Sequence, residues 1–255
     1  MINTNGVLAV MDHHLTINWD DGPTMHRIAA QVRYRIAEAA TIRTMRVNAS
    51  QRYSDDPLSF MTIGDGLRAA WIWKEQGPGW TAQLAVTNEG DDDVYLHALD
   101  VIRVDYAFGG LFNLGAPPGL WQVSLEDVRG LLAAPADAPI VPDTWSTSES
   151  EAWSPTIPGG FVRRRCMIVQ PTVSNRTRPP AVMIRVLDAD AVPPTARTEI
   201  HLEVSGERFD RLTARYRTEG MLLGTGAGVA SPEFWIVAGD DAEELRRAEI
   251  TGCGL

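Results

Sequence analysis

The sequence predicts an all-β fold, a large antiparallel β-sandwich with few short helices. Three observations lead to this prediction. Runs in which apolar and polar residues alternate recur along the chain, helical signals are sparse, and no strand-helix unit repeats eight times. The 255 residues, 44% of them hydrophobic, are enough for one large core, and we expect a single domain over residues 1–255.

The clearest strand begins at Trp80 and ends before the turn Asn88-Glu89-Gly90-Asp91. We expect the next run, Val94 to Phe108, to pair with it as a neighbouring strand. That run is long for one strand, and its Asp100 and Asp105 indicate a bulge, a bend or a crossing between sheets.

Six further runs show the same alternation, with turns such as Val204-Ser205-Gly206-Glu207 between them. They are Leu67 to Glu75, Phe161 to Val169, Ala181 to Leu187, Thr198 to Val204, Arg211 to Arg217 and Glu233 to Ala238. In the run from Thr198, apolar residues occupy one face, and Glu199, His201 and Glu203 occupy the other. A sheet with one buried face needs a second layer, which predicts the two-layer sandwich.

Helical and irregular segments complete the prediction. Asp240 and Asp241 followed by glutamates and then arginines predict a short helix that starts near Asp240. Ala133 to Pro142 and Asp143 to Gly160 have the composition of long loops, which are often functional when ordered.

The overall charge argues against several classes of partner. The formal net charge of −10 would repel a phosphate backbone, so we expect no nucleic acid partner. No run of 18 apolar residues predicts a membrane span, and Met1 to Trp19 lacks the pattern of a signal peptide. Cys166 and Cys253 have no metal-binding spacing and fit a reducing compartment, so we expect a cytoplasmic protein.

Four segments resemble the N-terminal β-supersandwich of glycoside hydrolase family 36, the α-galactosidase and melibiase group. They are WTAQLAVTN with the following VYLHALDVIRVDY, LFNLG with DTWSTSESEAWSP, FDRLTARYRTEG with MLLGTGAGVASPEFWIVAGDD, and DDAEELRRAEI. The resemblance implies a galactose mutarotase-like supersandwich that precedes a catalytic barrel absent from this chain.

The resemblance also implies a function. In that family both catalytic aspartates belong to the barrel, so no residue of this chain inherits their roles. We therefore expect a non-catalytic N-terminal domain that supports the sugar site and oligomer contacts. Its expected partner is a galactoside-like carbohydrate or a downstream barrel, and the chain could also form a homo-oligomer. We expect neither a cofactor nor a metal.

Two other readings stay open. The supersandwich also resembles sugar mutarotases, in which histidines and a carboxylate exchange protons with the sugar, and His97, His201 and Glu203 would take those roles here. In a stand-alone carbohydrate-binding module, Trp145 and Trp153 of the polar loop would contact a sugar face. The same two tryptophans would contact the barrel in the first reading.

Overall fold

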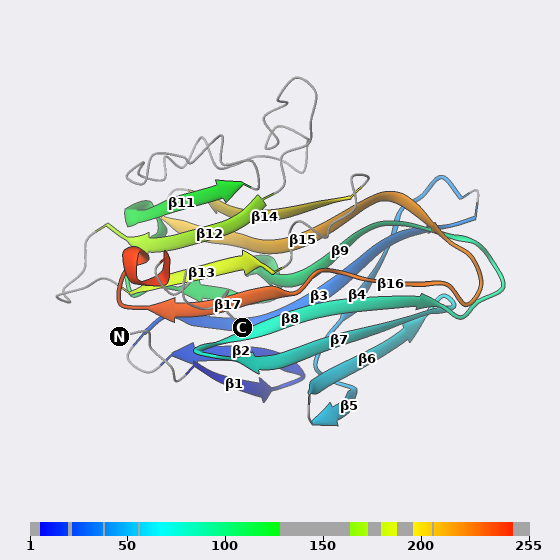
Figure 1. Cartoon of the computed structure of the whole chain (residues 1–255), viewed down its shortest axis with the longest axis horizontal. Coiled ribbons are helices and arrows are strands. Elements are labelled where there is room, and N and C mark those ends of the chain that lie inside the picture. The colour runs from blue at the N-terminus through cyan, green and yellow to red at the C-terminus, as the bar shows by residue number, and fades with distance from the viewer. Residues whose placement is uncertain are drawn as a thin grey trace, which may run out of the picture.

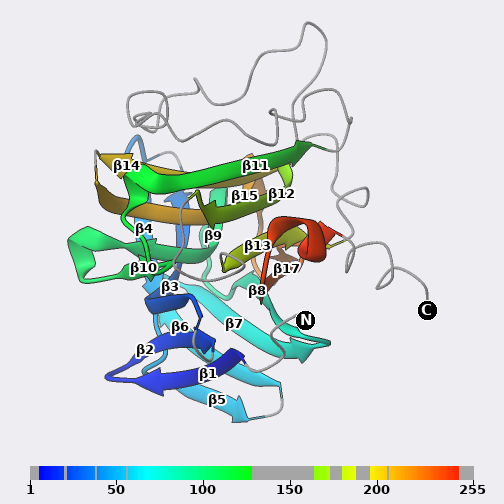
Figure 2. The same ribbon diagram turned by 90° about the vertical axis from the view of Figure 1, so that its left-hand side faces the viewer.

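The computed structural model describes residues 6–19, 22–37, 39–55, 57–127, 164–172, 180–187, 196–205 and 207–246. Over these ranges the chain forms two antiparallel sheets stacked as a sandwich (Figures 1 and 2). The predicted fold class is therefore confirmed. Among the described residues, no helix has the length and apolar character needed to cross a membrane.

The first layer, the β9 sheet, has eight strands in the order β1-β2-β3-β9-β15-β14, with β10 and β4 also paired to β3. Its strands are β1 (Gly6–Met11), β2 (His14–Trp19), β3 (Thr24–Ile36), β4 (Arg43–Val47), β9 (Val94–Asp105), β10 (Leu111–Asn113), β14 (Arg197–Ser205) and β15 (Arg208–Leu223). The short 3-10 helix η1 (Tyr106–Phe108) follows β9, and η2 (Pro118–Leu120) follows β10.

The second layer, the β8 sheet, has nine strands in the order β11-β12-β13-β17-β8-β7-β6-β5, with β16 paired to β8. Its strands are β5 (Arg52–Asp55), β6 (Leu58–Gly64), β7 (Leu67–Gln76), β8 (Gly79–Asn88), β11 (Trp121–Asp127), β12 (Arg164–Pro171), β13 (Ala181–Val186), β16 (Gly228–Ala230) and β17 (Phe234–Gly239). The two layers approach each other where β12 contacts β14.

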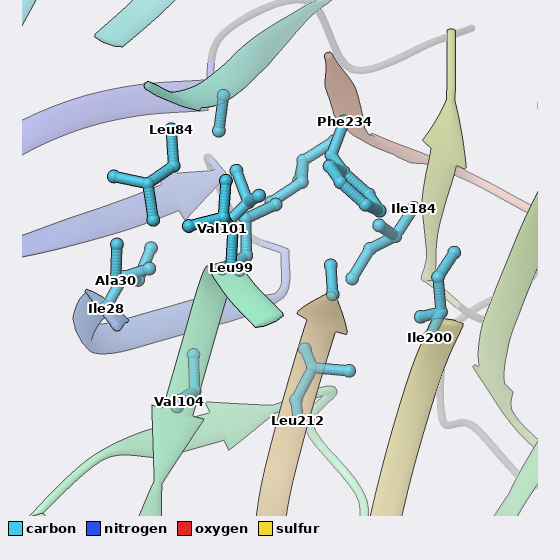
Figure 3. Packing of buried hydrophobic residues seen from close by; sticks show 14 of the residues in the cluster. Ile28, Ala30, Leu84, Leu99, Val101, Val104, Ile184, Ile200, Leu212 and Phe234 are labelled. Carbon is cyan, nitrogen blue, oxygen red and sulfur yellow. The ribbon is translucent and has the colours of Figure 1, made fainter. Parts of the chain in front are cut away.

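The core lies between the layers and is filled by side chains from both sheets. Ile184 and Phe234 of the β8 sheet point toward Leu99, Leu212 and Ile200 of the β9 sheet (Figure 3). Fully burying one such side chain contributes roughly 1.5–3 kcal/mol, so this interior is the main source of stability. The alternation seen in the sequence is what turns these residues inward.

Tryptophans join the two layers. Trp71 and Trp73 of β7 are fully buried, with ring centroids 5.4 Å apart. The indole Nε1 of Trp71 donates a hydrogen bond of 2.9 Å to the carbonyl oxygen of Val101 in the opposite sheet. Val101 sits where the pairing of β9 with β15 slips, which confirms the bulge predicted near Asp100.

The predicted pairing of the run from Val94 with the strand from Trp80 is wrong. β8 pairs with β7, β16 and β17, whereas β9 pairs with β3 and β15 in the other sheet. The turn after Asn88 is a crossover between layers and not a hairpin. The amide Nδ2 of Asn88 holds this crossover by donating to the carbonyl oxygens of Asp92 and Leu223, at 2.8 and 2.9 Å.

The predicted helix is present, with residues 242–246 helical. Its cap is Asp241, whose Oδ1 accepts a hydrogen bond of 2.8 Å from the backbone N–H of Glu244. The two predicted loops, Ala133 to Pro142 and Asp143 to Gly160, lie outside the described residues.

Candidate functional site

The outward side of the β9 sheet carries rows of charged residues, which we call the charged face. Residues paired directly across neighbouring strands share a face, so the pairing register defines the rows. One row is Arg46, Gln31, Asp100, Arg215 and Glu199; the others are Thr44, Arg33, Ala98, Arg217 and Arg197, then Ala29, Arg103, Thr213 and His201, and finally Asp105, Arg211 and Glu203.

Asp100 is the centre of the charged face and is fully buried. Arg215 contacts it through two nitrogens, with Nη2 3.2 Å from Oδ2, and Arg103 Nη1 lies 3.2 Å from the same oxygen. Burial alone would raise the pKa of this carboxyl, but the charges of Arg215, Arg103 and Arg33 hold its pKa below the ordinary value. Asp100 is therefore an ionised anchor for two arginines.

Glu199 forms a second centre, at the end of the row that contains Asp100 and Arg215. Its Oε2 lies 3.1 Å from Nε2 of His201, and its Oε1 lies 3.4 Å from Nη1 of Arg217. Burial acts to raise its pKa, but the contact with His201 and the charge of Arg217 lower the pKa of Glu199 to about 2. This carboxylate accepts hydrogen bonds and is a poor proton donor at neutral pH.

The last row behaves differently at its two ends. Asp105 accepts a hydrogen bond of 2.8 Å from Arg103 and pairs with Arg211 at 3.3 Å. Glu203 lies 3.7 Å from Arg211, a looser contact, and burial raises the pKa of its carboxyl despite the charges of Arg211 and His201. The pKa of Glu203 thus moves toward neutrality, whereas the pKa values of Asp100 and Glu199 move away from it.

The three residues of the mutarotase-like reading lie in one sheet. His201 and Glu203 are two positions apart on the outward face of β14, and His97 is on β9, with β15 between them. His201 contacts Glu199 rather than Glu203. Burial lowers the pKa of His97, as does the charge of Arg35. The structure thus brings together His201 and Glu203, and their proposed roles stay a prediction.

A cleft of about 510 Å³ lies beside the last row. Asp105 connects the two, because its Oδ1 accepts a hydrogen bond of 3.1 Å from Ala107 N in η1. Tyr106 at the lip is 51% exposed, and the Arg208 guanidinium lies 5.4 Å from its ring centroid. The remaining lining includes Phe112, Trp121 and Phe209 as an apolar floor, with Asn113 and Glu207 as polar groups.

The sequence reasoning missed most of this site. The outward positions of β14 were recognised, but the matching charges of β15 and β9 were not connected to them. The signal was present as arginines two or four residues apart, which puts Arg211, Arg215 and Arg217 on one side of a strand. Trp145 and Trp153 lie outside the described residues. Within the described part of the chain, no group of three histidine, cysteine or acidic residues could hold a metal.

Comparisons with known proteins identify the fold but no family. No protein-family model matches the chain, and no curated protein matches it. Among solved structures, it is similar to a polysaccharide lyase, with 11% identity over 97% of this chain and 34% of that chain and a TM-score of 0.51. At this identity the similarity shows a shared β-sandwich fold and nothing about activity.

Family 36 α-galactosidases from Geobacillus stearothermophilus are also among the matches. One in complex with raffinose has 13% identity and a TM-score of 0.43, and covers 84% of this chain and 30% of that chain. Another has 11% identity and a TM-score of 0.39. The chain spans about a third of the length of the structures it matches.

Proposed function

We propose that this chain is a non-catalytic β-supersandwich domain of a larger carbohydrate-active protein of the α-galactosidase type. In this proposal residues 1–255 form one domain that precedes a catalytic barrel, supports its sugar site and contributes to oligomer contacts. The charged face and the adjoining cleft are the surface turned to the sugar.

The observation that carries the proposal is the pairing of carboxylates with arginines on the charged face. Asp100, Asp105 and Glu199 each contact a guanidinium within 3.4 Å. Hydrolysis of a glycoside requires one carboxyl group that donates a proton, and a carboxylate stabilised as an anion by arginine does so poorly. Fixed guanidinium and carboxylate groups instead suit the hydrogen-bonding of sugar hydroxyls.

The cleft supports the sugar part of the proposal. An exposed aromatic ring is a platform for the apolar face of a sugar, and Tyr106 stands at the lip with one ring face near Arg208. Asn113 and Glu207 would add a donor and an acceptor nearby. An apolar pocket with a small number of polar groups, like this cleft, is typical of small-molecule binding sites.

A mutarotase-like enzyme is the second candidate, and Glu203 is the observation that favours it. Its pKa is raised by burial, and His201 lies on the same outward face two residues away. A carboxyl with a raised pKa beside an imidazole can exchange protons with a sugar ring oxygen.

Binding and rate measurements on the whole chain separate the two candidates. We expect galactose to bind, and Tyr106→Ala to weaken that binding by up to about tenfold. The control Tyr53→Ala makes the same substitution at a tyrosine of β5 that is 72% exposed, and it should leave galactose binding unchanged. Polarimetry should show no acceleration of galactose mutarotation. Acceleration that is lost in both His201→Ala and Glu203→Gln would establish the enzyme instead, and failure to bind galactose would refute the proposed sugar role.

A further inference from the structure

Two exposed arginines meet at Phe108, the last residue of η1. We call this place the Phe108 corner. The Arg46 guanidinium of β4 lies 4.6 Å from the centroid of the Phe108 ring. Arg27 of β3 reaches the same residue from another side, with Nη1 donating a 3.3 Å hydrogen bond to the Phe108 carbonyl oxygen. Phe108 is itself 53% exposed, so both guanidinium groups lie at an accessible surface.

The backbone at this corner is adapted to hold Arg27 in place. Arg27 has a φ of 54°, in the left-handed region, where a side chain with a Cβ is strained. Gly109 has a φ of 75°, and a Cβ added there would lie 2.7 Å from Arg27 Nη1. The absence of a side chain at Gly109 thus makes room for the guanidinium. Strain of this kind persists where the surrounding structure enforces it, and it often marks a functional position.

Among the described residues, the positive charge at this corner is only partly offset, by the charge of Asp105 acting on Arg46. Within the described part of the chain, no carboxylate lies within ion-pair distance of Arg27 or Arg46. Asp105 is the nearby acid, and its Oδ2 is occupied by Arg103 and Arg211. Burial and then repulsion from Arg103 lower the pKa of Arg46. Concentrated positive charge is unusual on a chain whose net charge is −10.

A histidine adds a third group. Nδ1 of His14, at the start of β2, is buried and has no hydrogen-bond partner among the described residues. His14 and Arg27 lie on neighbouring strands, each next to one member of the directly paired Leu15 and Ile28. Burial lowers the pKa of His14, and the charges of Arg27 and Arg46 lower it further. An anion bound between them would relieve this repulsion.

We propose that Arg27, Arg46 and His14 bind an oxyanion carried by a saccharide, either a uronate carboxylate or a sulfate ester, beside the Phe108 ring. The planar guanidinium fork matches two oxygens of such a group. The ring of Phe108 offers an apolar surface to the sugar that carries the anion. The saccharide part of this inference rests on the proposed function; the anion part rests on the three basic residues alone.

The test compares three ligands with the whole chain: galacturonate, galactose and inorganic sulfate. We expect galacturonate to bind at least about tenfold more tightly than galactose at low salt, and sulfate to displace it. The double variant Arg27→Gln with Arg46→Gln should lower galacturonate affinity by at least about tenfold. A matched variant, Arg52→Gln with Arg68→Gln, removes two charges from exposed arginines of β5 and β7 and should keep galacturonate affinity within about twofold.

Thermal unfolding of both double variants checks that the fold is retained. The comparison of galacturonate, galactose and sulfate on the wild-type chain tests the anion site even if a variant fails to fold. Equal affinity for galacturonate and galactose, or equal loss in both double variants, would overturn the anion site while leaving the proposed sugar role intact. Binding of sulfate without binding of either sugar would refute the saccharide part of both proposals.

Discussion

The outward faces of the two sheets have opposite characters. On the β9 sheet, Asp100 and Glu199 are surrounded by arginines. On the β8 sheet, a second apolar cluster lies outside the main core, covered by helical residues 242–246. Its members are Cys166, Ile168, Ala181, Met183, Trp235, Val237, Ala242 and Leu245. One sandwich thus has a covered apolar face and a charged face.

This difference teaches that the outward side chains of a sheet are apolar where another segment of the chain covers them and charged where none of the described segments does. Gly239 at the end of β17 lets the helix approach, because a Cβ there would lie 2.8 Å from Leu245 Cδ2. On the charged face, partners are supplied within the sheet itself, one strand to the next. The first arrangement depends on excluded water and the second on matched charges, so the two should respond differently to mutation, pH and salt.

The largest effect is expected from Asp100→Asn. Removing the charge leaves Arg103 and Arg215 without the buried anion between them, and breaking a buried pair costs roughly 3–5 kcal/mol. Urea unfolding followed by tryptophan fluorescence measures this loss. A cost below about 1 kcal/mol would mean that Asp100 behaves as a surface carboxylate.

Leu245→Ala should destabilise the covered face by about 2–3 kcal/mol, because Leu245 is fully buried under its helix. The same urea experiment applies. Unlike the loss in Asp100→Asn, this loss should be nearly constant between pH 4 and 7 at a fixed salt concentration. A strong pH dependence would show that the apolar cluster is coupled to the charged face.

Glu199→Gln should change how stability depends on pH. Because the pKa of Glu199 falls to about 2 in the folded chain, its stabilising effect is complete above the ordinary pKa of glutamate and is lost as pH falls toward about 2. The variant should therefore show a shallower loss of stability on acidification than the wild type. At neutral pH we expect a cost of roughly 1.5–3 kcal/mol from the lost charged hydrogen bonds. Parallel acid titrations of wild type and variant would contradict this.

Glu203→Gln should have the smallest effect. Burial raises the pKa of Glu203, so its ionised form slightly destabilises the fold at pH values above that pKa. Replacing it with neutral glutamine should leave stability at pH 7 unchanged or raise it by less than about 1 kcal/mol. Thermal unfolding at pH 7 decides this. A clear loss would show that the Glu203 pairing with Arg211 is stronger than its 3.7 Å separation implies.

Several features could be predicted from the sequence for identifiable reasons. The strand predicted from Trp80 became β8, in which Ala82, Leu84 and Val86 are buried, because a strand presents successive side chains to opposite sides. The alternation predicted from Leu67 to Glu75 became β7, in which Trp71 and Trp73 are fully buried. Asp241 in a run of acidic residues before arginines indicated the helix start, because its side chain can satisfy a free backbone N–H.

The pairing of β9 and the charged face could not be predicted. A turn after a strand favours a hairpin locally, whereas here the chain crosses into the other layer, and Asn88 holds the crossover through bonds to residues as distant as Leu223. In the same way, Asp100 and Arg215 are 115 residues apart and become neighbours through the register of β9 and β15. The register between strands so distant in the sequence cannot be predicted from local patterns.

The sequence by itself therefore determined that the fold is an all-β sandwich and where several strands from β7 onward lie, including the side of β14 that faces the core. These properties depend on neighbouring residues and on the two-residue period of a strand. Only the tertiary structure decided which strands are neighbours, and hence that Asp100 is held by Arg215 and that Arg27 and Arg46 meet at Phe108. Charges act over a few ångströms in space, and the fold alone sets those distances.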